Sequence, residues 1–560
     1  MQLWTALRTT QRVARKAAFP VTLSLVAGLL ASAPVRAQQP QGGDTVAPAG
    51  QSDAPRPDAA PAGAAGMAGT AADAGNGGAP DMSASEAAYR RGDFATARAE
   101  LEKLAKTGNA QALYRLAFLM VRGKGGPQDL AGAAALLRRS AEQRNTDAQT
   151  LLGKLYLQGA GVDRNFASAA RLFELAAEKG AAQAQFFIGK MYRDGVGVPA
   201  DPLKGLTWLQ ASARQGVAEA MFELAVMFGK GQGVTADEAE SLRWLEMASD
   251  AGLPLAQYTL AQNYTRGGAI ARNDEKALAL YRKSAEAGYV PAQSALGALY
   301  FAGEGGLAKD PGEAFVWFTR AAEGGDANAQ TNLAYMYATG TGVTRDDAIA
   351  AKFYNQAAEA GLPRAQAAFA VMLSEGRGVK KNEAAAEQWY LLAARAGLET
   401  AERRLGELYA DGTYGVTDRA AVARWVHAAA LDGDATAAKW LETASDDGVL
   451  AAQGRLADVL AKGAAGNAPD PKRALDLYRD GAERGDPYCQ LQLGLLYARG
   501  EGVEQDYIQA HKWVNLSAAD GNSAAIKSRD LFASLMTPEQ VSEAQRQARQ
   551  WSADHLSQER

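Results

Sequence analysis

The sequence contains few of the cysteine and histidine residues on which many enzymes and metal-binding proteins depend. It has one cysteine, Cys489, and three histidines, His427, His511 and His555, among 560 residues. A single cysteine cannot form an internal disulfide. No pair of these residues has the spacing of metal ligands and no Cys/His cluster is present, so we predict no metal site, no cofactor and no enzyme activity.

Glycine is abundant, but its distribution does not predict a phosphate-binding loop. The stretch "GKGQGV", from Gly229 to Val234, is not followed by a Lys-Ser/Thr pair at Walker spacing, and similar glycines recur at regular intervals. Carboxylates recur in "AAE" segments, so no pair stands out as a general acid and base. Cys489 occupies a position that is alanine in other copies of the repeat described below, which predicts a buried, unreactive thiol.

Positive charge is in deficit as well. The 59 Lys and Arg against 63 Asp and Glu give a net charge of −4. Without the first 37 residues, which hold five basic and no acidic residues, the balance is 54 against 63, or −9. Nucleic-acid binding requires a basic face, so this chain is not expected to bind nucleic acid.

The N-terminal part predicts export. Residues 1–37 have a basic start, an apolar stretch and "VRA" before Gln38, which fits a signal peptide cleaved after Ala37. The apolar stretch is short for a spanning helix and contains Pro20; a retained anchor is the alternative. Residues 38–81 are rich in Ala, Gly and Pro, which predicts a disordered linker, either a spacer or a tail. We therefore expect a periplasmic or secreted protein with no integral membrane segment after cleavage.

The rest of the chain is dominated by a repeat with a step of about 36 residues. Each copy opens with a small residue followed by apolar residues at helical spacing, continues through G-x-G-V or a variant of it, and then carries a large aromatic before "AAE-x-G" variants. In the copy that begins at Ala148, we expect Gly153 to lie where a neighbouring backbone comes close. The copies begin at Ala112, Ala148, Ala184, Ala220, Ala256, Ala292, Ala329, Ala365, Ala401, Ala452 and Cys489.

This pattern predicts a pair of short antiparallel helices per copy. The glycines end the first helix, and the aromatics of the second helix are predicted to pack in a core. One such pair cannot bury its apolar faces alone, so neighbouring pairs must stack into an α-solenoid. The aromatics are Phe173, Trp208, Trp244, Tyr281, Trp317, Phe353, Trp389, Trp425, Tyr478 and Trp513.

The A-x-x-x-L-G-x-x-Y-x-x-G-x-G-V pattern with its downstream W-x-x-x-A-A-E-x-G resembles the Sel1-like repeat, a relative of the tetratricopeptide repeat. The resemblance implies an all-α, right-handed solenoid. We expect capping helices at 82–111, nine units at 112–433, an extra helix and bend at 434–451, two further units at 452–522, and a C-terminal cap and tail at 523–560.

The resemblance also implies a role in protein binding. Proteins of this kind in the bacterial periplasm are associated with signalling receptors, envelope assembly and exopolysaccharide systems. The main hypothesis is a non-catalytic adaptor that binds another protein or a peptide segment on its concave face. The alternatives are a structural component of an exopolysaccharide or secretion assembly and, with less support, a hydrolase acting on the cell wall.

The freer positions of the first helices predict a binding surface. Counting the opening alanine as zero, positions +2, +6 and +9 are not needed for the core. They bring aromatic residues together with positive charge, which suits an extended or acidic peptide, and the alternative is packing between adjacent helices. The candidate residues are Phe186, Phe222, Tyr258, Lys154, Lys190 and Arg193.

One segment departs from the period. Trp440 follows Trp425 by only 15 positions, and Gly433 and Gly448 bound a single helical stretch of about Asp434 to Asp447. "VLA", from Val449 to Ala451, is too short to return along a helix, so the next helix must reverse its usual direction or the stack must bend. We therefore predict a break in the solenoid near 434–451.

Overall fold

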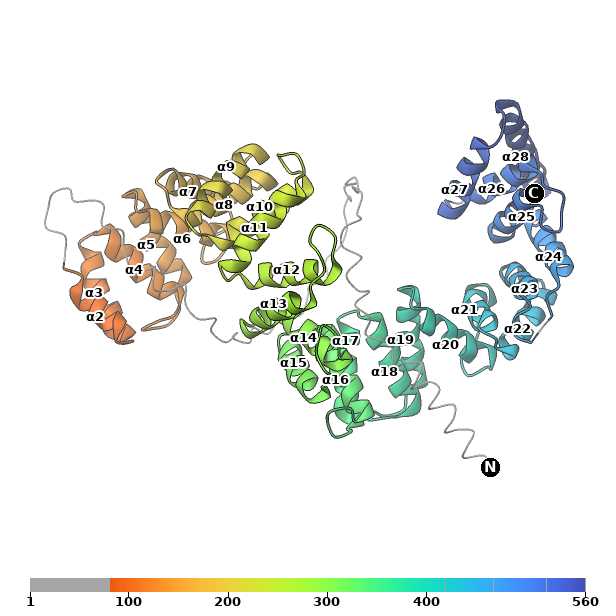
Figure 1. Ribbon diagram of the computed structural model, residues 1–560, viewed down its shortest axis with the longest axis horizontal. Helices are drawn as coiled ribbons and strands as arrows, with labels where there is room; N and C mark the ends of the chain where they lie inside the picture. The colour runs from red at the N-terminus through yellow and green to blue at the C-terminus, as the bar shows by residue number, and fades with distance from the viewer. Residues whose placement is uncertain (1–80, 417, 467, 520, 559–560) are drawn as a thin grey trace. The chain divides into compact units, whose positions relative to one another are not determined.

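The computed structural model describes residues 81–558 apart from residues 417, 467 and 520. Within these ranges all regular structure is helical, with 27 helices and no strand (Figure 1), which confirms the predicted all-α class. The predicted signal peptide, residues 1–37, and all of the predicted linker 38–81 except Asp81 lie outside the described residues.

The helices have the following bounds: α2 Ser83–Arg90, α3 Phe94–Lys106, α4 Ala110–Val121, α5 Leu130–Glu142, α6 Thr146–Gln158, α7 Phe166–Glu178, α8 Ala182–Asp194, α9 Pro202–Arg214, α10 Ala218–Lys230, α11 Glu238–Asp250, α12 Pro254–Arg266, α13 Asp274–Glu286, α14 Val290–Ala302, α15 Pro311–Glu323, α16 Ala327–Thr339, α17 Asp347–Glu359, α18 Pro363–Glu375, α19 Glu383–Arg395, α20 Glu399–Ala410, α21 Arg419–Leu431, α22 Ala435–Asp446, α23 Leu450–Lys462, α24 Pro471–Glu483, α25 Pro487–Arg499, α26 Tyr507–Ala518, α27 Ser523–Ser534 and α28 Pro538–Gln558.

The ends of the helices follow from local sequence. In the repeat of α6 and α7, Gly159 ends α6 with a left-handed φ of 72°, as expected for a helix C-terminus. The Asn165 side chain then accepts a hydrogen bond from the Ser168 amide at 2.9 Å and caps α7. An Asp or Asn cap of this kind begins the second helix of every repeat: Asp129, Asn165, Asp201, Asp237, Asn273, Asp310, Asp346, Asn382, Asp418, Asp470 and Asp506.

The second glycine of the G-x-G-V loop joins one repeat to the preceding one. A Cβ atom on Gly378 would lie 1.9 Å from the carbonyl oxygen of Asp347, the first residue of α17. The loop after α18 therefore rests directly on the first turn of the previous second helix. Arg377 in the same loop strengthens this contact, because its Nη2 donates to Asp347 Oδ1 at 3.0 Å.

The glycine within the first helix makes a different contact from the predicted one in the copy that begins at Ala148. A Cβ atom on Gly153 would meet the ring of Phe173 at 2.8 Å, so a side chain and not a backbone requires the space. The expected backbone approach occurs at the equivalent Gly406, where a Cβ atom would lie 2.1 Å from the Trp425 carbonyl oxygen. The prediction for Gly153 was wrong because a large ring at Phe173 fills the gap between the helices.

The aromatics of the second helices mostly belong to the core, as predicted. Seven of the ten are buried: Phe173, Trp244, Tyr281, Trp317, Trp425, Tyr478 and Trp513. Trp208, Phe353 and Trp389 are half-buried.

The helices form two compact units, and we describe each by itself. Unit 1 ends at Gly324 and unit 2 begins at Gly325. The described part of unit 1 runs from α2 to α15, and that of unit 2 from α16 to α28. The predicted array 112–433 thus spans both units.

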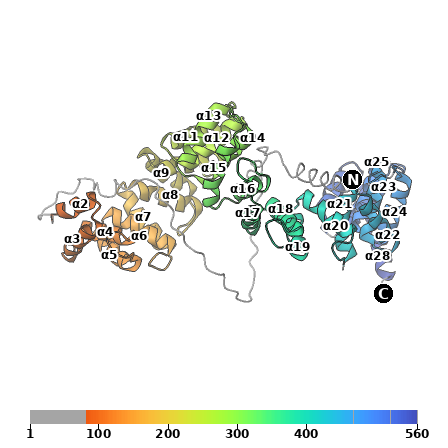
Figure 2. The same ribbon diagram turned by 90° about the horizontal axis from the view of Figure 1, so that it is seen from below.

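Unit 2 contains the predicted extra helix as α22. Arg419, at the start of α21, pairs with Asp447, just after α22, at 2.7 Å, so α21 and α22 are antiparallel. The short link to α23 reverses the chain again, and α21 packs against α23 as well as against α22. In Figure 1 the row of helices from α16 to α21 changes direction at α22 and α23. Figure 2 shows the helices from α20 to α25 gathered closely together when seen from below. The predicted break is confirmed: α23, a first helix by sequence, runs parallel to the second helix α21.

Candidate functional site

The predicted aromatic residues lie on the first helices α8, α10 and α12 of unit 1, and all three are half-buried. Phe186 and Phe222 pack against the hydrophobic core around Leu209 and Leu224. Tyr258 lies edge-on to Tyr281 and Tyr289, with ring centroids 5.8 and 5.5 Å apart. Each ring therefore contributes one face to packing and leaves part of its surface exposed.

The predicted cations are held by neighbours. Lys190 Nζ lies 2.9 Å from Glu223 Oε1. Arg193 donates to Glu223 and, at 2.6 Å, to Asp194. Because Glu223 belongs to α10, these contacts bind α8 to the following first helix.

Lys154 is held by an aromatic ring. Its Nζ lies 4.9 Å from the centroid of Phe187, which itself stacks on Phe173 at 4.9 Å. Burial lowers the pKa of Lys154, against the opposing effect of Glu219. The structure thus joins Lys154 to Phe187, and Lys190 to both Glu223 and the ring of Phe186, whose centroid is 5.8 Å away.

We call this set the first-helix surface: the half-exposed side chains at positions +2, +3, +6 and +9 of α6, α8, α10 and α12. Sequence reasoning missed its +3 members, Phe187 and Glu223. Their signal was available, since both follow the predicted aromatics Phe186 and Phe222 by one residue. Glu223 changes the chemistry of the surface, because it pairs with Lys190 and Arg193, which were predicted to present positive charge to a peptide.

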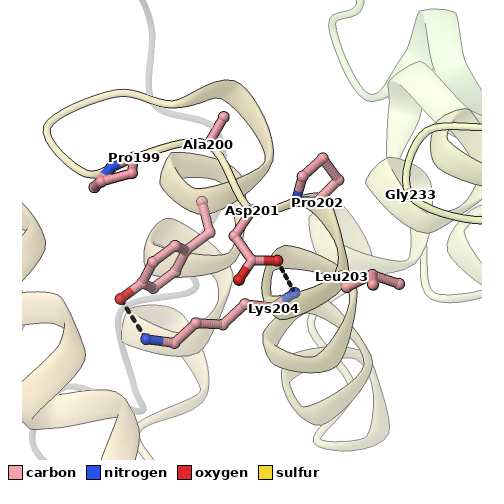
Figure 3. A pocket seen from close by; sticks show the side chains of 8 residues that line it. Pro199, Ala200, Asp201, Pro202, Leu203, Lys204 and Gly233 are labelled. Carbon is pink, nitrogen blue, oxygen red and sulfur yellow. Dashed lines mark hydrogen bonds between the residues drawn. The ribbon is translucent and has the colours of Figure 1, made fainter.

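A hollow of about 590 Å³ opens beside this surface, between the end of α8, the start of α9 and the loop after α10 (Figure 3). Lys204 donates to the Tyr192 hydroxyl, and both side chains donate to Glu174 Oε1, at 2.8 Å from Lys204 and 2.7 Å from Tyr192. The hydrogen bonds from Lys204 and Tyr192 lower the pKa of Glu174. The charges of Lys204 and Glu174 compensate one another. Asp201 also lines the hollow and accepts from the Lys204 amide at 3.0 Å, as the cap of α9.

Unit 2 contains a polar cluster around Asp458, on α23. Tyr478 and Tyr488 each donate a hydrogen bond to its carboxylate. His427 Nε2, on α21, lies 2.9 Å from Asp458 Oδ2, a close polar contact without the angle of a directed hydrogen bond. Burial alone would raise the pKa of Asp458, but the contacts with His427, Tyr478 and Tyr488 hold it below its usual value. The side chains of Asp458 and His427 are only 18% and 16% exposed.

The remaining chemically distinctive residues are structural. Cys489 is fully buried and burial raises the pKa of its thiol, as predicted for an unreactive cysteine. His511 is 1% exposed and burial lowers its pKa. His555 stacks on Trp551 with centroids 4.5 Å apart. Within residues 81–558, outside the three gaps, no group of three or more His, Cys, Asp or Glu is placed to hold a metal ion.

Comparison with known proteins explains the arrangement. The family described as Sel1 repeat matches eleven segments: 110–145, 146–180, 182–217, 218–253, 254–289, 290–326, 327–362, 363–398, 400–434, 450–486 and 487–522. The chain belongs to the Sel1 repeat family. The matches leave out residues 435–449, which hold the extra helix α22.

Solved structures of Sel1 repeat proteins are similar to this chain. The crystal structure of c5321, a protective antigen of uropathogenic Escherichia coli with an SLR fold, is 30% identical over 82% of this chain and 95% of that one, with a TM-score of 0.51. A Sel1 repeat protein from Oxalobacter formigenes is 31% identical over 55% of this chain and 90% of that one, with a TM-score of 0.42. Comparison with the curated proteins gives no match.

Membership of the family indicates a general type of function. Sel1 repeat proteins generally mediate protein–protein interaction and are typically non-catalytic scaffolds. Among the helices of the described part of the chain, none combines the length and apolar character needed to cross a membrane.

Proposed function

We propose that this Sel1 repeat protein is a non-catalytic adaptor of the bacterial periplasm that binds a partner protein through the first-helix surface of unit 1. The observation that carries the proposal is the half-exposure of Phe186, Phe222 and Tyr258 at the same position of three successive first helices. A packing residue gains most when it is fully buried, whereas an interface anchor must keep part of its ring accessible.

Charge contacts between repeats support the same role. Glu223 holds Lys190 and Arg193 in place, and the ring of Phe187 holds Lys154. Side chains that are already ordered lose less conformational entropy when a partner binds. The partner surface we expect is therefore mainly apolar with polar edges, because the cations of this surface are already paired. Regulation of envelope signalling is the process that this role fits best.

The test replaces Phe222 with serine. We expect the free energy of unfolding to fall by only about 1 to 2 kcal/mol, because the ring is partly solvated in the folded state. Partner capture from an envelope extract, measured by quantitative mass spectrometry against the unmodified protein, should fall by about tenfold or more.

The matched control is Leu175→Ser, on the second helix α7, where the leucine is 43% exposed and outside the first-helix surface. It should leave capture unchanged. Equal losses in both variants, or unfolding of Phe222→Ser at 25 °C, would contradict the proposal and make the aromatics packing residues. The captured protein also separates an adaptor of a signalling receptor from a component of an export assembly. The location is tested by the N-terminal sequence of the protein recovered from the periplasm. An N-terminus at Gln38 would show cleavage after Ala37.

A further inference from the structure

The contact between α21 and α23 in unit 2 has no counterpart in a regular Sel1 repeat, because α22 is the extra helix that brings the two together. The helices run parallel, so residues a constant distance apart in sequence face one another. His427 faces Asp458, 31 positions later, at 2.9 Å. One helical turn towards the N-terminus on both helices, the same offset pairs Arg424 with Arg455.

Arg424 and Arg455 therefore occupy matching positions on two parallel helices beside the Asp458 cluster, near enough for the charge of Arg455 to lower the pKa of Arg424. We call them the arginine pair. Arg424 is exposed and its guanidinium carbon lies 3.6 Å from the ring centroid of Trp425. Arg455 is half-buried, lies 5.0 Å over the ring of Tyr488 and donates from Nη1 to the Ala451 carbonyl oxygen at 2.6 Å.

The pair lacks compensation from acidic residues at contact distance. Among the described residues, no carboxylate forms an ion pair with either guanidinium, in contrast to the neighbouring Arg403 and Arg419, which pair with Asp432 and Asp447 at 2.6 and 2.7 Å. Burial lowers the pKa of Arg424, and Arg395 and Arg455 add to the effect, while Glu402 opposes it. Facing like charges destabilise a structure, so an anion placed between them would relieve the repulsion.

The shape of the pair favours a carboxylate. The rings of Trp425 and Tyr488 hold the two guanidinium groups in place. Arg455 uses Nη1 for the Ala451 carbonyl oxygen, and its remaining N–H groups and those of Arg424 stay available to a ligand. A guanidinium edge matches a carboxylate with two parallel hydrogen bonds. An acidic segment of a protein supplies carboxylates at short intervals along an extended backbone, which suits two arginines on adjacent parallel helices.

We propose that Arg424 and Arg455 form a binding site for an Asp- or Glu-rich segment of a partner protein. This site goes beyond the proposed function, since it uses residues of α21 and α23 and none of the first-helix surface of unit 1. It also assigns a role to α22: the extra helix creates the contact on which the pair depends.

The probe is a fluorescent peptide of six glutamates, with a peptide of six glutamines as its neutral counterpart. Fluorescence anisotropy with the mature chain should show affinity for the glutamate peptide about tenfold or more above that for the glutamine peptide, and this preference should weaken as salt is added. The variant Arg424→Gln/Arg455→Gln should lose about tenfold or more in affinity for the glutamate peptide. Its melting temperature should fall no further than that of the control variant below, because the removal of the repulsion offsets the lost contacts with Trp425, Tyr488 and the Ala451 carbonyl oxygen.

The matched control removes the same charge from the same region: Arg403→Gln/Arg419→Gln takes two arginines out of the ion pairs on α20 and α21. It should change the affinity by less than about threefold. Three results would overturn the proposal: no preference for the glutamate peptide, equal losses of affinity in both double variants, or a melting temperature for the first double variant below that of the control variant, which would make the arginine pair a structural element. Binding to the first-helix surface of unit 1 is untouched by all four substitutions, so failure here is distinct from failure of the proposed adaptor role.

Discussion

Replacing Gly378 with alanine is expected to lower the free energy of unfolding of unit 2 by about 3 kcal/mol. Gly378 has a φ of +68°, which costs an alanine about 1 to 2 kcal/mol. The added Cβ atom would also lie 1.9 Å from the Asp347 carbonyl oxygen. A backbone oxygen has no rotamer through which to move away, so the loop and the first turn of α17 must separate.

The control for this prediction is Gly361→Ala. Gly361 has a φ of +86° but nothing within 4 Å of its Cβ position, so it carries the backbone cost without the contact. Urea unfolding followed by circular dichroism should show that Gly378→Ala costs about 2 kcal/mol more than Gly361→Ala. Equal midpoints for the two variants would show that the loop does not hold the repeats together.

The second large effect concerns the Asp458 cluster. Tyr478 and Tyr488 donate to different oxygens of Asp458, and an asparagine keeps only one of these two acceptors. Asp458→Asn should therefore cost about 2 to 3 kcal/mol at pH 7, since it also removes the negative charge beside His427. The control is Asp447→Asn, where the ion pair with Arg419 has a carboxylate that is 55% exposed. That variant should lose less than about 1 kcal/mol.

The pH dependence of this difference follows from the sign of the pKa shift. The pKa of Asp458 is lowered in the folded state, so the folded protein binds the proton less readily than the unfolded chain. The stabilisation is fully present above the unfolded aspartate pKa of about 3.9 and is lost as the pH falls through the lower, folded value. The midpoint difference between the unmodified protein and Asp458→Asn should therefore shrink below about pH 4. A difference that stays constant between pH 7 and pH 3 would contradict the assigned contacts.

Much of the fold could be predicted because its causes are local. Three features repeat about every 36 residues: the glycines that end helices, the spacing of the apolar residues, and the large aromatic of the second helix. Each copy therefore predicts the same pair of helices. The extra helix could be predicted for the same reason, since Gly433 and Gly448 bound it and Val449 to Ala451 is too short to return the chain. The Asp and Asn residues that cap the second helices are equally regular in the sequence, but they were not predicted as caps.

Contacts between helices of different repeats could not be predicted from the repeat. Whether Glu223 reaches Lys190 and Arg193 depends on how far α10 rotates relative to α8, which no spacing within one repeat specifies. The contact of His427 with Asp458 requires α21 to meet α23 across an inserted helix. The division between the units at Gly324 and Gly325 was missed because the nearest irregularity is a single residue, a step of 37 from Ala292 to Ala329.

A recurring glutamine shows how the inserted helix changes a conserved type of contact within this chain. In ordinary repeats the glutamine after the opening residue donates back to the preceding second helix, as Gln366 does to the Ala358 carbonyl oxygen at 3.3 Å. At the break, Gln453 donates forward instead, to Leu477 O at 3.2 Å and to Asp480 Oδ2 at 2.6 Å. The expected acceptor is displaced because α22, and not a second helix, precedes α23.

The parallel course of α21 and α23 has a consequence for any attempt to rearrange this protein. Within unit 2, α22 reverses the edge at which the chain enters each repeat, so the glycine loops before α22 and those after it lie at opposite ends of the helices. In a chain that lacked α22 alone, the second helix α21 would lead directly into α23, and α23 would then have to run in the usual direction of a first helix. Such a chain should therefore lose the parallel contact between α21 and α23, while each remaining repeat keeps its own pair of antiparallel helices.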